Sequence, residues 1–342
     1  MKSLNFLYPE PQKLVLVEEE VPAVGPATVL IESIVSHVST GTEMWCYRGI
    51  FDPGTVFSEW VKFPFYPGYS TAGRVLEVGS EVKDIKPGDL VHTGQPHRQY
   101  VTVEYGEKEG NSLVGRTITK IPDGISPDEA VWGSMAGVAI VGCRKAKIEF
   151  GEYVAVIGAG PIGQMTVQYA KLCGAVRVVA IDTVQKRLDC ALESGATDVL
   201  CMDAKYAAGA VEELFGGKPE VVFDATGNYE VLKYACDITK TGGRIILNGD
   251  TPEPSKQIPG PLLSKSLDVR AVHGNIASDI ASLPWVGKRH TQMNFDFMIQ
   301  KRIKVNHLIS HRYKPQDAPE VYRKLFQDRS YSVGVVFDWA DL

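Results

Sequence analysis

Short apolar runs alternate with amphipathic stretches through the middle of the chain, and this alternation predicts its architecture. The apolar runs that fit strands lie near 153–157, 177–181, 198–201, 219–224, 243–248 and 267–272. Strands that alternate with helices are typical of a parallel sheet with helices on both faces. The pattern therefore predicts an α/β domain over residues 148–288, built on a doubly wound, six-stranded parallel sheet.

The first part of the chain has a different pattern, in which short β-rich runs are separated by proline and glycine. Three of these runs cover residues 28–35, 70–78 and 86–91. Such spacing is typical of a small antiparallel β-barrel rather than a helical bundle. A helical stretch over 126–147 follows it, so we expect the first domain to occupy residues 1–147.

The last part of the chain returns to a mixed pattern. It predicts a helix over 292–302, a strand over 307–311, a helix over 315–327 and a final strand over 332–338. A segment of this size is too small to bury a core of its own. We therefore expect residues 289–342 to complete the first domain.

A glycine-rich motif follows the first predicted strand of the parallel sheet. It reads Gly158-Ala-Gly160-Pro161-Ile162-Gly163 and opens an amphipathic stretch. Glycines in this spacing let backbone amides at a helix N-terminus approach a pyrophosphate. The motif and its strand–turn–helix context predict a dinucleotide site formed by these residues.

An acidic residue, Asp182, closes the next apolar run. A carboxylate at this point accepts hydrogen bonds from the adenosine ribose and repels a 2′-phosphate, and Thr183 supplies no cation to offset it. The sequence therefore favours NAD. Lys186 and Arg187 follow closely enough to reach a phosphate by another path, so NADP remains an alternative.

Composition excludes several classes of function. The chain has 342 residues, a net charge of −5 and no block of lysine or arginine, which argues against a nucleic-acid or anionic-membrane surface. Its apolar stretches are shorter than a membrane span, and its N-terminus lacks a signal-peptide core. We therefore expect a cytoplasmic enzyme that acts on a small molecule.

Two further motifs support a family assignment. The segment from Gly68 to Gly79 and the run Lys-Pro-Gly-Asp-Leu-Val at 86–91, followed late in the chain by the dinucleotide motif, resemble the medium-chain dehydrogenase/reductase superfamily. This resemblance implies a GroES-like catalytic domain, a Rossmann domain and a homodimer or homotetramer. It also implies cofactor contacts from Thr226-Gly227 and Asn248-Gly249.

The resemblance also identifies where zinc ligands are missing. Zinc-dependent members carry cysteine or histidine ligands at positions that correspond here to Thr40, Tyr69 and Trp132. These side chains cannot form the nitrogen- and sulfur-rich tetrahedral site that catalytic zinc requires. The four-cysteine lobe that binds structural zinc in many relatives is missing too.

A rebuilt zinc site would recruit Cys46, His92 and His97. Cys46 is displaced from the expected ligand position, and the two histidines have no recognised zinc spacing. The sequence therefore predicts an enzyme without zinc.

Segments 39–43, 67–69 and the C-terminal motifs look like those of bacteriochlorophyllide dehydrogenases and zinc-lacking sugar or polyol dehydrogenases. The resemblance implies hydride transfer between NAD(P) and a secondary alcohol or ketone, with a sugar or polyol-like compound as the expected substrate. A hydroxyethyl tetrapyrrole is the alternative substrate. The sequence also leaves open a zinc-free enoyl or quinone reductase, and a dinucleotide-binding sensor that has lost catalysis.

Without zinc, side chains must manage the proton of the reacting hydroxyl. Thr42 matches the family's hydroxyl residue that begins the proton relay, and Tyr69 brings a phenol that could donate a proton or, with a lowered pKa, accept one. Glu43 either orients Thr42, acts as a base, or forms an ion pair with a nearby cation such as Arg74. His97 is either a residue of the cleft or a buried structural histidine.

Aromatic side chains near these residues suggest a pocket for a sugar ring or a flat macrocycle. We assign Thr40, Trp45 and Trp132 to this substrate pocket, with core packing as the alternative for about half of the aromatic side chains.

Overall fold

The computed structural model describes residues 1–106, 118–272, 287–340 and 342. The chain divides into two compact units. The first unit comprises Met1–Ile50, Val56–Ser134 and Leu283–Leu342, and the second comprises Phe51–Thr55 and Met135–Ser282.

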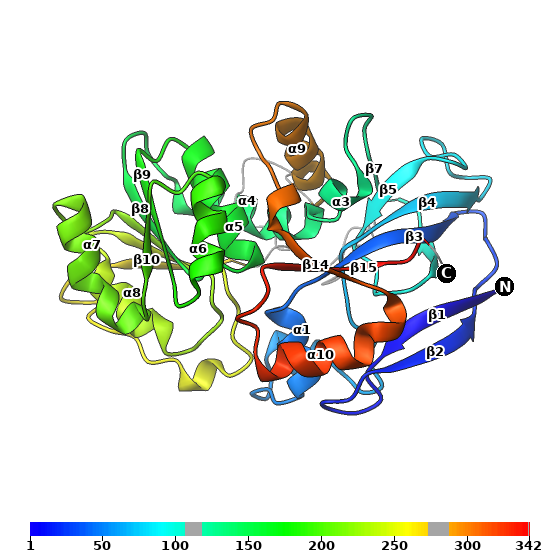
Figure 1. Cartoon of the computed structure of the whole chain (residues 1–342), viewed down its shortest axis with the longest axis horizontal. Coiled ribbons are helices and arrows are strands. Elements are labelled where there is room, and N and C mark those ends of the chain that lie inside the picture. The colour runs from blue at the N-terminus through cyan, green and yellow to red at the C-terminus, as the bar shows by residue number, and fades with distance from the viewer. Residues whose placement is uncertain (107–117, 273–286, 341) are drawn as a thin grey trace. The chain divides into compact units, whose positions relative to one another are not determined.

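A six-stranded parallel sheet forms the centre of the second unit (Figure 1). Its strands are β8 (Tyr153–Ile157), β9 (Arg177–Asp182), β10 (Asp198–Cys201), β11 (Val221–Asp224), β12 (Arg244–Leu247) and β13 (Asp268–Ala271). Their order, β10-β9-β8-β11-β12-β13, reverses direction between β8 and β11, and such a reversal is where doubly wound folds bind nucleotides. The prediction of a doubly wound, six-stranded parallel sheet is confirmed.

Helices cover both faces of this sheet. They are α5 (Pro161–Leu172), α6 (Gln185–Glu193), α7 (Ala207–Phe215) and α8 (Val231–Ile238). Ala155 and Ile157 pack in one cluster with buried residues of α7 and α8, whereas Val156 faces Gly163 of α5. Since successive strand residues point to opposite faces, α5 lies on the face opposite α7 and α8.

Helix α4 (Gly133–Ala146) belongs mainly to the second unit, although the sequence placed the boundary after residue 147. The guanidinium of Arg270 donates to the carbonyl of Lys145, and Lys145 Nζ donates to the carbonyl of Ala271 at 3.3 Å. These contacts attach the end of α4 to β13, which moves the boundary to residue 134.

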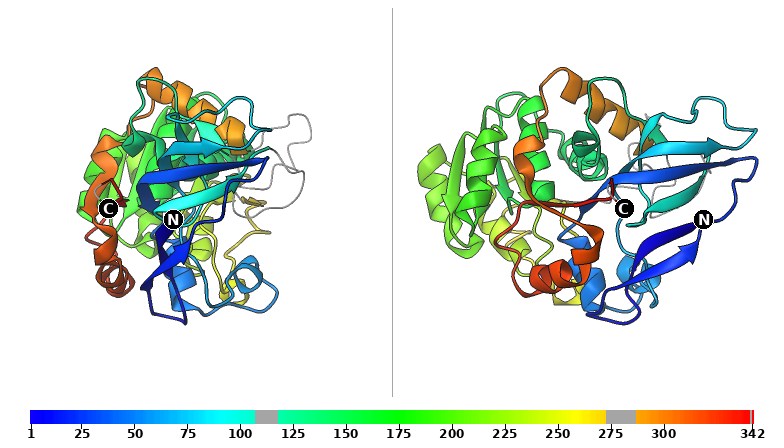
Figure 2. Two further views of the ribbon diagram at one scale, coloured as in Figure 1. Left: turned by 90° about the vertical axis from the view of Figure 1, so that its right-hand side faces the viewer. Right: turned by 45° about the vertical axis from the view of Figure 1, so that its right-hand side comes forward.

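A seven-stranded sheet forms the centre of the first unit, beside a two-stranded ribbon of β1 and β2 at the N-terminus (Figure 2). The strands of the unit are β1 (Lys2–Leu7), β2 (Val15–Glu20), β3 (Thr28–Val38), β4 (Thr71–Val78), β5 (Leu90–Thr93), β6 (Tyr100–Glu104), β7 (Ile118–Lys120), β14 (Ile309–Tyr313) and β15 (Gly334–Asp338). Valine and isoleucine side chains of β3, β4, β5, β6 and β7 form a buried core.

Strand β3 organises the first unit because it pairs with β4, β6 and β15. All three pairings are antiparallel, as predicted, but β14 and β15 run parallel. A parallel pair needs a crossover connection, and α10 (Ala318–Gln327) supplies it. The remaining α-helices of this unit are α1 (Thr42–Arg48), α2 (Val56–Trp60), α3 (Pro127–Ala130) and α9 (Gly287–Ile299).

Short 3-10 helices complete the secondary structure that is described. They are η1 (Ala204–Tyr206), η2 (Pro254–Lys256), η3 (Asn306–Leu308) and η4 (Pro315–Asp317). None of the helices in the described part of the chain combines the length and apolar character that crossing a bilayer requires.

Candidate active site

The glycine loop between β8 and α5 contains glycines with two different roles. Gly158 has φ +91°, and a Cβ atom on it would lie 2.8 Å from Thr226 Cγ2. A Cβ on Gly163 would lie 1.8 Å from the carbonyl oxygen of Gly158. The turn and the close packing of the helix on the strand therefore require these two glycines.

Gly160 is not explained by the fold in the same way. Its φ is −73°, which any residue adopts, and no atom of the described residues lies within 4 Å of the position that its Cβ would occupy. A Cβ would instead extend into the open space at the N-terminus of α5, where backbone amides can bind an anion. This arrangement fits a pyrophosphate. Pro161 and Ile162 begin the helix, so their backbone lies at the same position.

Asp182 lies at the end of β9, where the ribose contact was predicted. Its Oδ2 accepts a hydrogen bond from the amide of Ala159 at 2.8 Å, and its Oδ1 accepts one from the amide of Val184 at 3.0 Å. These contacts hold the carboxylate beside the glycine loop. Arg187 Nη1 lies 3.7 Å from Asp182 Oδ2, so a cation suited to a 2′-phosphate lies beside the carboxylate that favours NAD.

The ends of β11 and β12 contain the four residues assigned to the nicotinamide side. A Cβ on Gly249 would lie 2.3 Å from the amide nitrogen of Gly227, so both backbones approach closely here. Asn248 points its side chain away from the strand ends: its Nδ2 donates to Thr166 Oγ1 at 3.2 Å, and its Oδ1 lies against Gly142. The side chain of Asn248 therefore packs between α4 and α5.

Asp224, at the end of β11, is a residue that the sequence analysis missed. Its Oδ1 accepts hydrogen bonds from the Thr226 amide at 2.9 Å and the Thr226 hydroxyl at 2.6 Å. Burial raises the pKa of Asp224 to about 6, although these hydrogen bonds oppose the shift. In the sequence, Asp224 ends an apolar run just before Thr226 and Gly227, and this position could have marked it as a residue of the site.

Three hydroxyl groups meet in the first unit. Tyr69 Oη lies 2.5 Å from Ser39 Oγ and 3.3 Å from Thr42 Oγ1. We call Ser39, Thr42 and Tyr69 the hydroxyl cluster. Ser39 follows β3, Thr42 begins α1, and Tyr69 precedes β4. The sequence analysis identified Thr42 and Tyr69 but missed Ser39 and helix α1, although the hydroxyl-rich run at 39–42 was a usable signal.

The environment of Tyr69 favours the protonated form of its phenol. Burial raises the pKa of its phenol to about 12, and the hydrogen bonds with Ser39 and Thr42 only partly oppose this shift. The phenol is therefore protonated at neutral pH and acts as a hydrogen-bond donor. This shift is opposite in direction to the lowered pKa that would favour Tyr69 as a base.

Glu43 is buried behind the hydroxyl cluster, with 1% of its surface exposed. Its Oε1 accepts the amide of Ser39 at 2.7 Å, and its Oε2 accepts the hydroxyl of Tyr322 and lies 3.1 Å from His97 Nε2. The alternative of an ion pair with Arg74 is absent among these contacts, because Arg74 is exposed and donates to the Gly88 carbonyl. The Glu43 carboxylate instead fixes the backbone of Ser39.

His97 is fully buried and uses both ring nitrogens. Its Nδ1 lies 2.7 Å from Ser36 Oγ, which also accepts the indole N–H of Trp339 at 2.9 Å. A neutral ring with the proton on Nε2 satisfies this network, because Nε2 then donates to Glu43 while Nδ1 accepts from Ser36. These contacts match the alternative of a structural histidine.

The positions assigned to a substrate pocket lie in different environments. The carbonyl of Thr40 accepts a hydrogen bond from Arg329 at 3.0 Å, and Trp45 is half-buried with the Arg48 guanidinium 5.3 Å from its ring. Trp132 is fully buried and packs on His37 with ring centroids 4.5 Å apart. The ring of Trp132, which the sequence assigned to the pocket, is therefore a core side chain.

His92 is a buried histidine with two hydroxyl neighbours. Its Nε2 lies 3.2 Å from Ser70 Oγ and 3.4 Å from Ser134 Oγ. Both hydroxyls already donate to backbone carbonyls, of Val131 and Tyr69 respectively, so His92 must carry the proton on Nε2 and donate it. Burial lowers the pKa of His92 to about 4, which keeps the ring neutral.

These environments test the fit of a zinc ion. Cys46, His92 and His97 do not form a ligand set, and within residues 1–106, 118–272, 287–340 and 342 no three His, Cys, Asp or Glu side chains are placed to hold a metal ion. The side chains that do meet are hydroxyls. Neutral hydroxyl groups do not fit the nitrogen and sulfur donors of a catalytic zinc site.

Comparison with known families gives two matches on separate parts of the chain. Residues 25–142 match the family described as "Alcohol dehydrogenase GroES-like domain", and residues 161–286 match the family described as "Zinc-binding dehydrogenase". The matches cover both kinds of domain that the sequence resemblance implied.

Characterised relatives and solved structures agree with this result. The chain is 31% identical over 225 residues to sorbitol dehydrogenase from Bombyx mori, covering 58% of this chain and 65% of that protein. It is 27% identical to sorbitol dehydrogenase from Rattus norvegicus, covering 94% and 92%. An Escherichia coli oxidoreductase/dehydrogenase of unknown specificity has the same fold, with a TM-score of 0.80, 20% identity and 99% coverage of both chains.

Proposed function

Because the chain belongs to the medium-chain dehydrogenase/reductase superfamily and is an NAD(P)-dependent oxidoreductase of the alcohol dehydrogenase type, we propose that it interconverts a secondary alcohol and a ketone without zinc. Similarity to sorbitol dehydrogenases supports a sugar or polyol-like substrate. The observation that carries the metal-free proposal is the hydroxyl cluster, in which Tyr69 stands where zinc-dependent members have a ligand.

The second unit would hold the cofactor through its own backbone. Gly158, Gly160 and Gly163 shape a loop whose open side suits a pyrophosphate, and Asp182 is fixed beside it to accept ribose hydroxyls. When bound, the nicotinamide donates or accepts the hydride. NAD is our preferred cofactor on the strength of Asp182, with NADP retained because of Arg187.

The hydroxyl cluster would manage the proton. In the reducing direction, Tyr69 donates its hydroxyl proton to the carbonyl oxygen of the substrate, which gains negative charge as the new C–H bond forms. The hydroxyls of Ser39 and Thr42 donate to the phenolate that remains until solvent returns a proton. In the oxidising direction the same groups accept the proton in the reverse order. Glu43 and His97 would keep Ser39 in place rather than exchange protons with the substrate.

Two substitutions test this mechanism. Tyr69→Phe removes the donor and Thr42→Val removes its hydroxyl neighbour while keeping similar side-chain shapes, so we expect kcat to fall by about 10²–10⁴-fold for Tyr69→Phe and less for Thr42→Val. Tyr206→Phe is a matched control, because Tyr206 is 70% exposed in the second unit. Unchanged turnover in both cluster variants would contradict the mechanism.

The absence of zinc needs a separate test, since one of the matched families is described as zinc-binding. Purified enzyme should retain its turnover after dialysis against a chelator and should contain substoichiometric zinc by elemental analysis. Full activity that requires one zinc ion per chain would overturn the metal-free proposal. A cytoplasmic homodimer or homotetramer remains our expectation for the assembled enzyme.

A further inference from the structure

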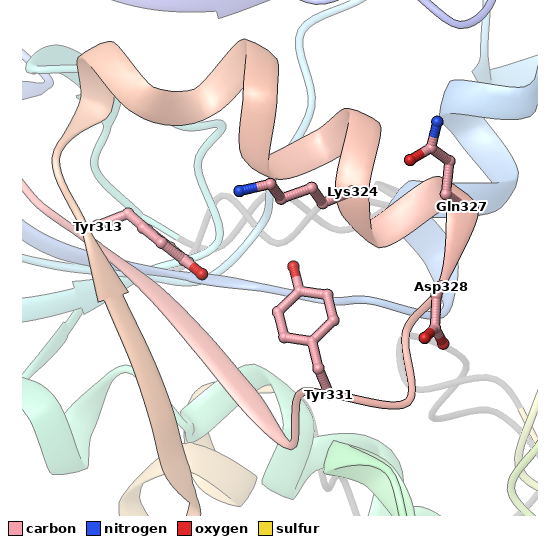
Figure 3. Close-up of a pocket in the computed structure, with 5 residues that line it drawn as sticks. All are labelled: Tyr313, Lys324, Gln327, Asp328 and Tyr331. Carbon is pink, nitrogen blue, oxygen red and sulfur yellow. The ribbon is translucent and has the colours of Figure 1, made fainter.

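Tyr313, Lys324, Gln327, Asp328 and Tyr331 line a pocket of about 330 Å³ in the first unit (Figure 3). It lies between β14, the end of α10 and the turn that leads to β15. We propose that this pocket binds an uncharged, polyhydroxylated compound such as a sugar or polyol. Its residues do not belong to the hydroxyl cluster, so the proposal goes beyond the proposed function.

Aromatic rings give the pocket stiff walls. Tyr313 stacks on His311 with centroids 5.9 Å apart, and Tyr331 meets the same imidazole edge-on at 5.0 Å. His311 therefore contacts both tyrosine rings. A tyrosine presents an apolar ring face and a polar hydroxyl, which match the C–H and O–H groups that alternate along a polyol.

The hydroxyl of Tyr331 interacts with the nearby Tyr313 but makes no well-formed hydrogen bond within the described part of the chain. Its Oη is buried with no hydrogen-bonding partner of adequate geometry among those residues, and it points toward the space between the Tyr313 hydroxyl and Lys324 (Figure 3). Burial and the nearby Tyr313 raise the pKa of Tyr331 to about 12, so the group stays protonated. A buried hydroxyl without a well-formed hydrogen bond is costly, and a ligand oxygen at this point would reduce that cost.

Lys324 covers the Tyr331 hydroxyl without being firmly held. Its side chain is 58% exposed, and its Nζ lies 3.6 Å from Glu320 Oε1, a carboxylate that Arg323 also binds at 2.7 Å. Surface pairs of this kind are weak. Lys324 can therefore move aside as a ligand enters and then donate to one of its hydroxyl oxygens.

The charges of the pocket favour a neutral ligand. Asp328 is held in place by the amide and hydroxyl of Ser330 at 2.7 and 2.8 Å, and its negative charge balances that of Lys324. Because these two charges offset each other, neither an anion nor a cation gains a net attraction, whereas hydroxyl groups can donate to the carboxylate and accept from the ammonium group. A sugar or polyol is therefore a better match than a phosphate.

The pocket has a direct connection to the loop of the hydroxyl cluster. Arg329, between Asp328 and Tyr331, donates to the carbonyl of Thr40 at 3.0 Å. An occupied pocket would hold this turn, and through Arg329 it would hold the backbone between Ser39 and Thr42.

The test uses the full-length protein with ¹³C-labelled tyrosine, titrated with sorbitol and followed by NMR. Resonances of Tyr313 and Tyr331 are assigned from the Tyr313→Phe and Tyr331→Phe variants. We expect both to shift in a saturable manner. Tyr331→Phe and Lys324→Met, followed through Tyr313, should each weaken sorbitol binding about fivefold, as expected for the loss of one hydrogen bond.

Three controls keep the outcome specific. Tyr206→Phe should leave the titration unchanged, and Tyr69→Phe should preserve the shifts of Tyr313 and Tyr331 even if it abolishes turnover. Inorganic phosphate should shift them less than sorbitol does. The proposal fails if neither resonance responds to sorbitol, if both pocket variants bind as the wild type does, or if phosphate binds more tightly. Loss of turnover in Tyr69→Phe is judged separately and concerns only the proposed function.

Discussion

Tyr69 Oη lies 2.5 Å from Ser39 Oγ, although the two residues are 30 positions apart in the chain. Ser39 in turn donates its backbone amide to the buried carboxylate of Glu43 at 2.7 Å. The phenol is thus oriented by a hydroxyl whose own backbone is fixed. This relationship makes Ser39 a positioning residue for the proposed proton donor.

Replacing Ser39 tests this role. We expect Ser39→Ala to lower kcat by about 10-fold or more with a smaller change in KM, because Tyr69 loses the hydroxyl that orients it and stabilises its phenolate. The pKa of Tyr69 should rise further, since the bond to Ser39 lowers it now. Spectrophotometric titration of tyrosine and the basic limb of the pH–rate profile would measure this.

Ser39→Thr, which restores a hydroxyl, should recover part of the activity that Ser39→Ala loses. If the alanine variant keeps its kcat while Tyr69→Phe loses it, the positioning role of Ser39 is wrong but the donor role of Tyr69 stands.

Glu43→Ala should destabilise the fold strongly. The substitution leaves the Ser39 amide, the Tyr322 hydroxyl and His97 Nε2 buried without their acceptor, and each buried donor left unsatisfied typically costs about 1–3 kcal/mol. Denaturant unfolding would measure the loss. Glu320→Ala is the control, and its exposed surface pairs predict little change. Equal effects from both substitutions would contradict the buried network.

Two substitutions in the glycine loop should separate an effect on cofactor binding from an effect on the stability of the fold. Gly160→Ala should leave the free energy of unfolding nearly unchanged, since its Cβ meets no atom of the described residues, but it should weaken NAD(P) binding by occupying the space proposed for the pyrophosphate. Gly163→Ala should destabilise the fold, because its Cβ would lie 1.8 Å from a carbonyl oxygen. Cofactor fluorescence titrations and chemical denaturation would distinguish them. Full cofactor affinity in Gly160→Ala would exclude the proposed site.

The raised pKa of Asp224 predicts that the free energy of unfolding depends on pH. Its pKa is raised from 3.8 to about 6 in the folded chain, so the folded state binds the proton more tightly than the unfolded state does. The stabilisation from this proton is complete below pH 3.8 and is lost as the pH rises through about 6, with a total of about 3 kcal/mol as an order of magnitude.

Asp224→Asn should therefore raise the free energy of unfolding relative to the wild type more at pH 8 than at pH 4. The amide keeps an acceptor for Thr226 but places no charge in the buried site. Unfolding of both proteins between pH 4 and 8 would check this. A stability difference that does not vary with pH would show that Asp224 titrates normally.

Local patterns in the sequence determined the elements of the second unit and the cofactor loop. Each of the six parallel strands lies within two residues of its predicted position, because each is a short, mainly apolar run that ends at a turn, and the four central strands are largely buried. The glycine motif was equally readable, since strand, turn and helix follow one another directly. Thr42 and Tyr69 were identified from the family resemblance.

Only the tertiary structure decided which partners these residues have. Ser39 reaches Tyr69 because β3 and the loop before β4 end side by side, and Tyr322 reaches Glu43 from 279 positions away. The same long-range packing placed Trp132 in the core, gave Glu43 buried partners instead of Arg74, and attached α4 to the second unit. Hydrogen bonds and burial depend on distances between segments that are remote in the chain, and a pattern of neighbouring residues does not contain those distances.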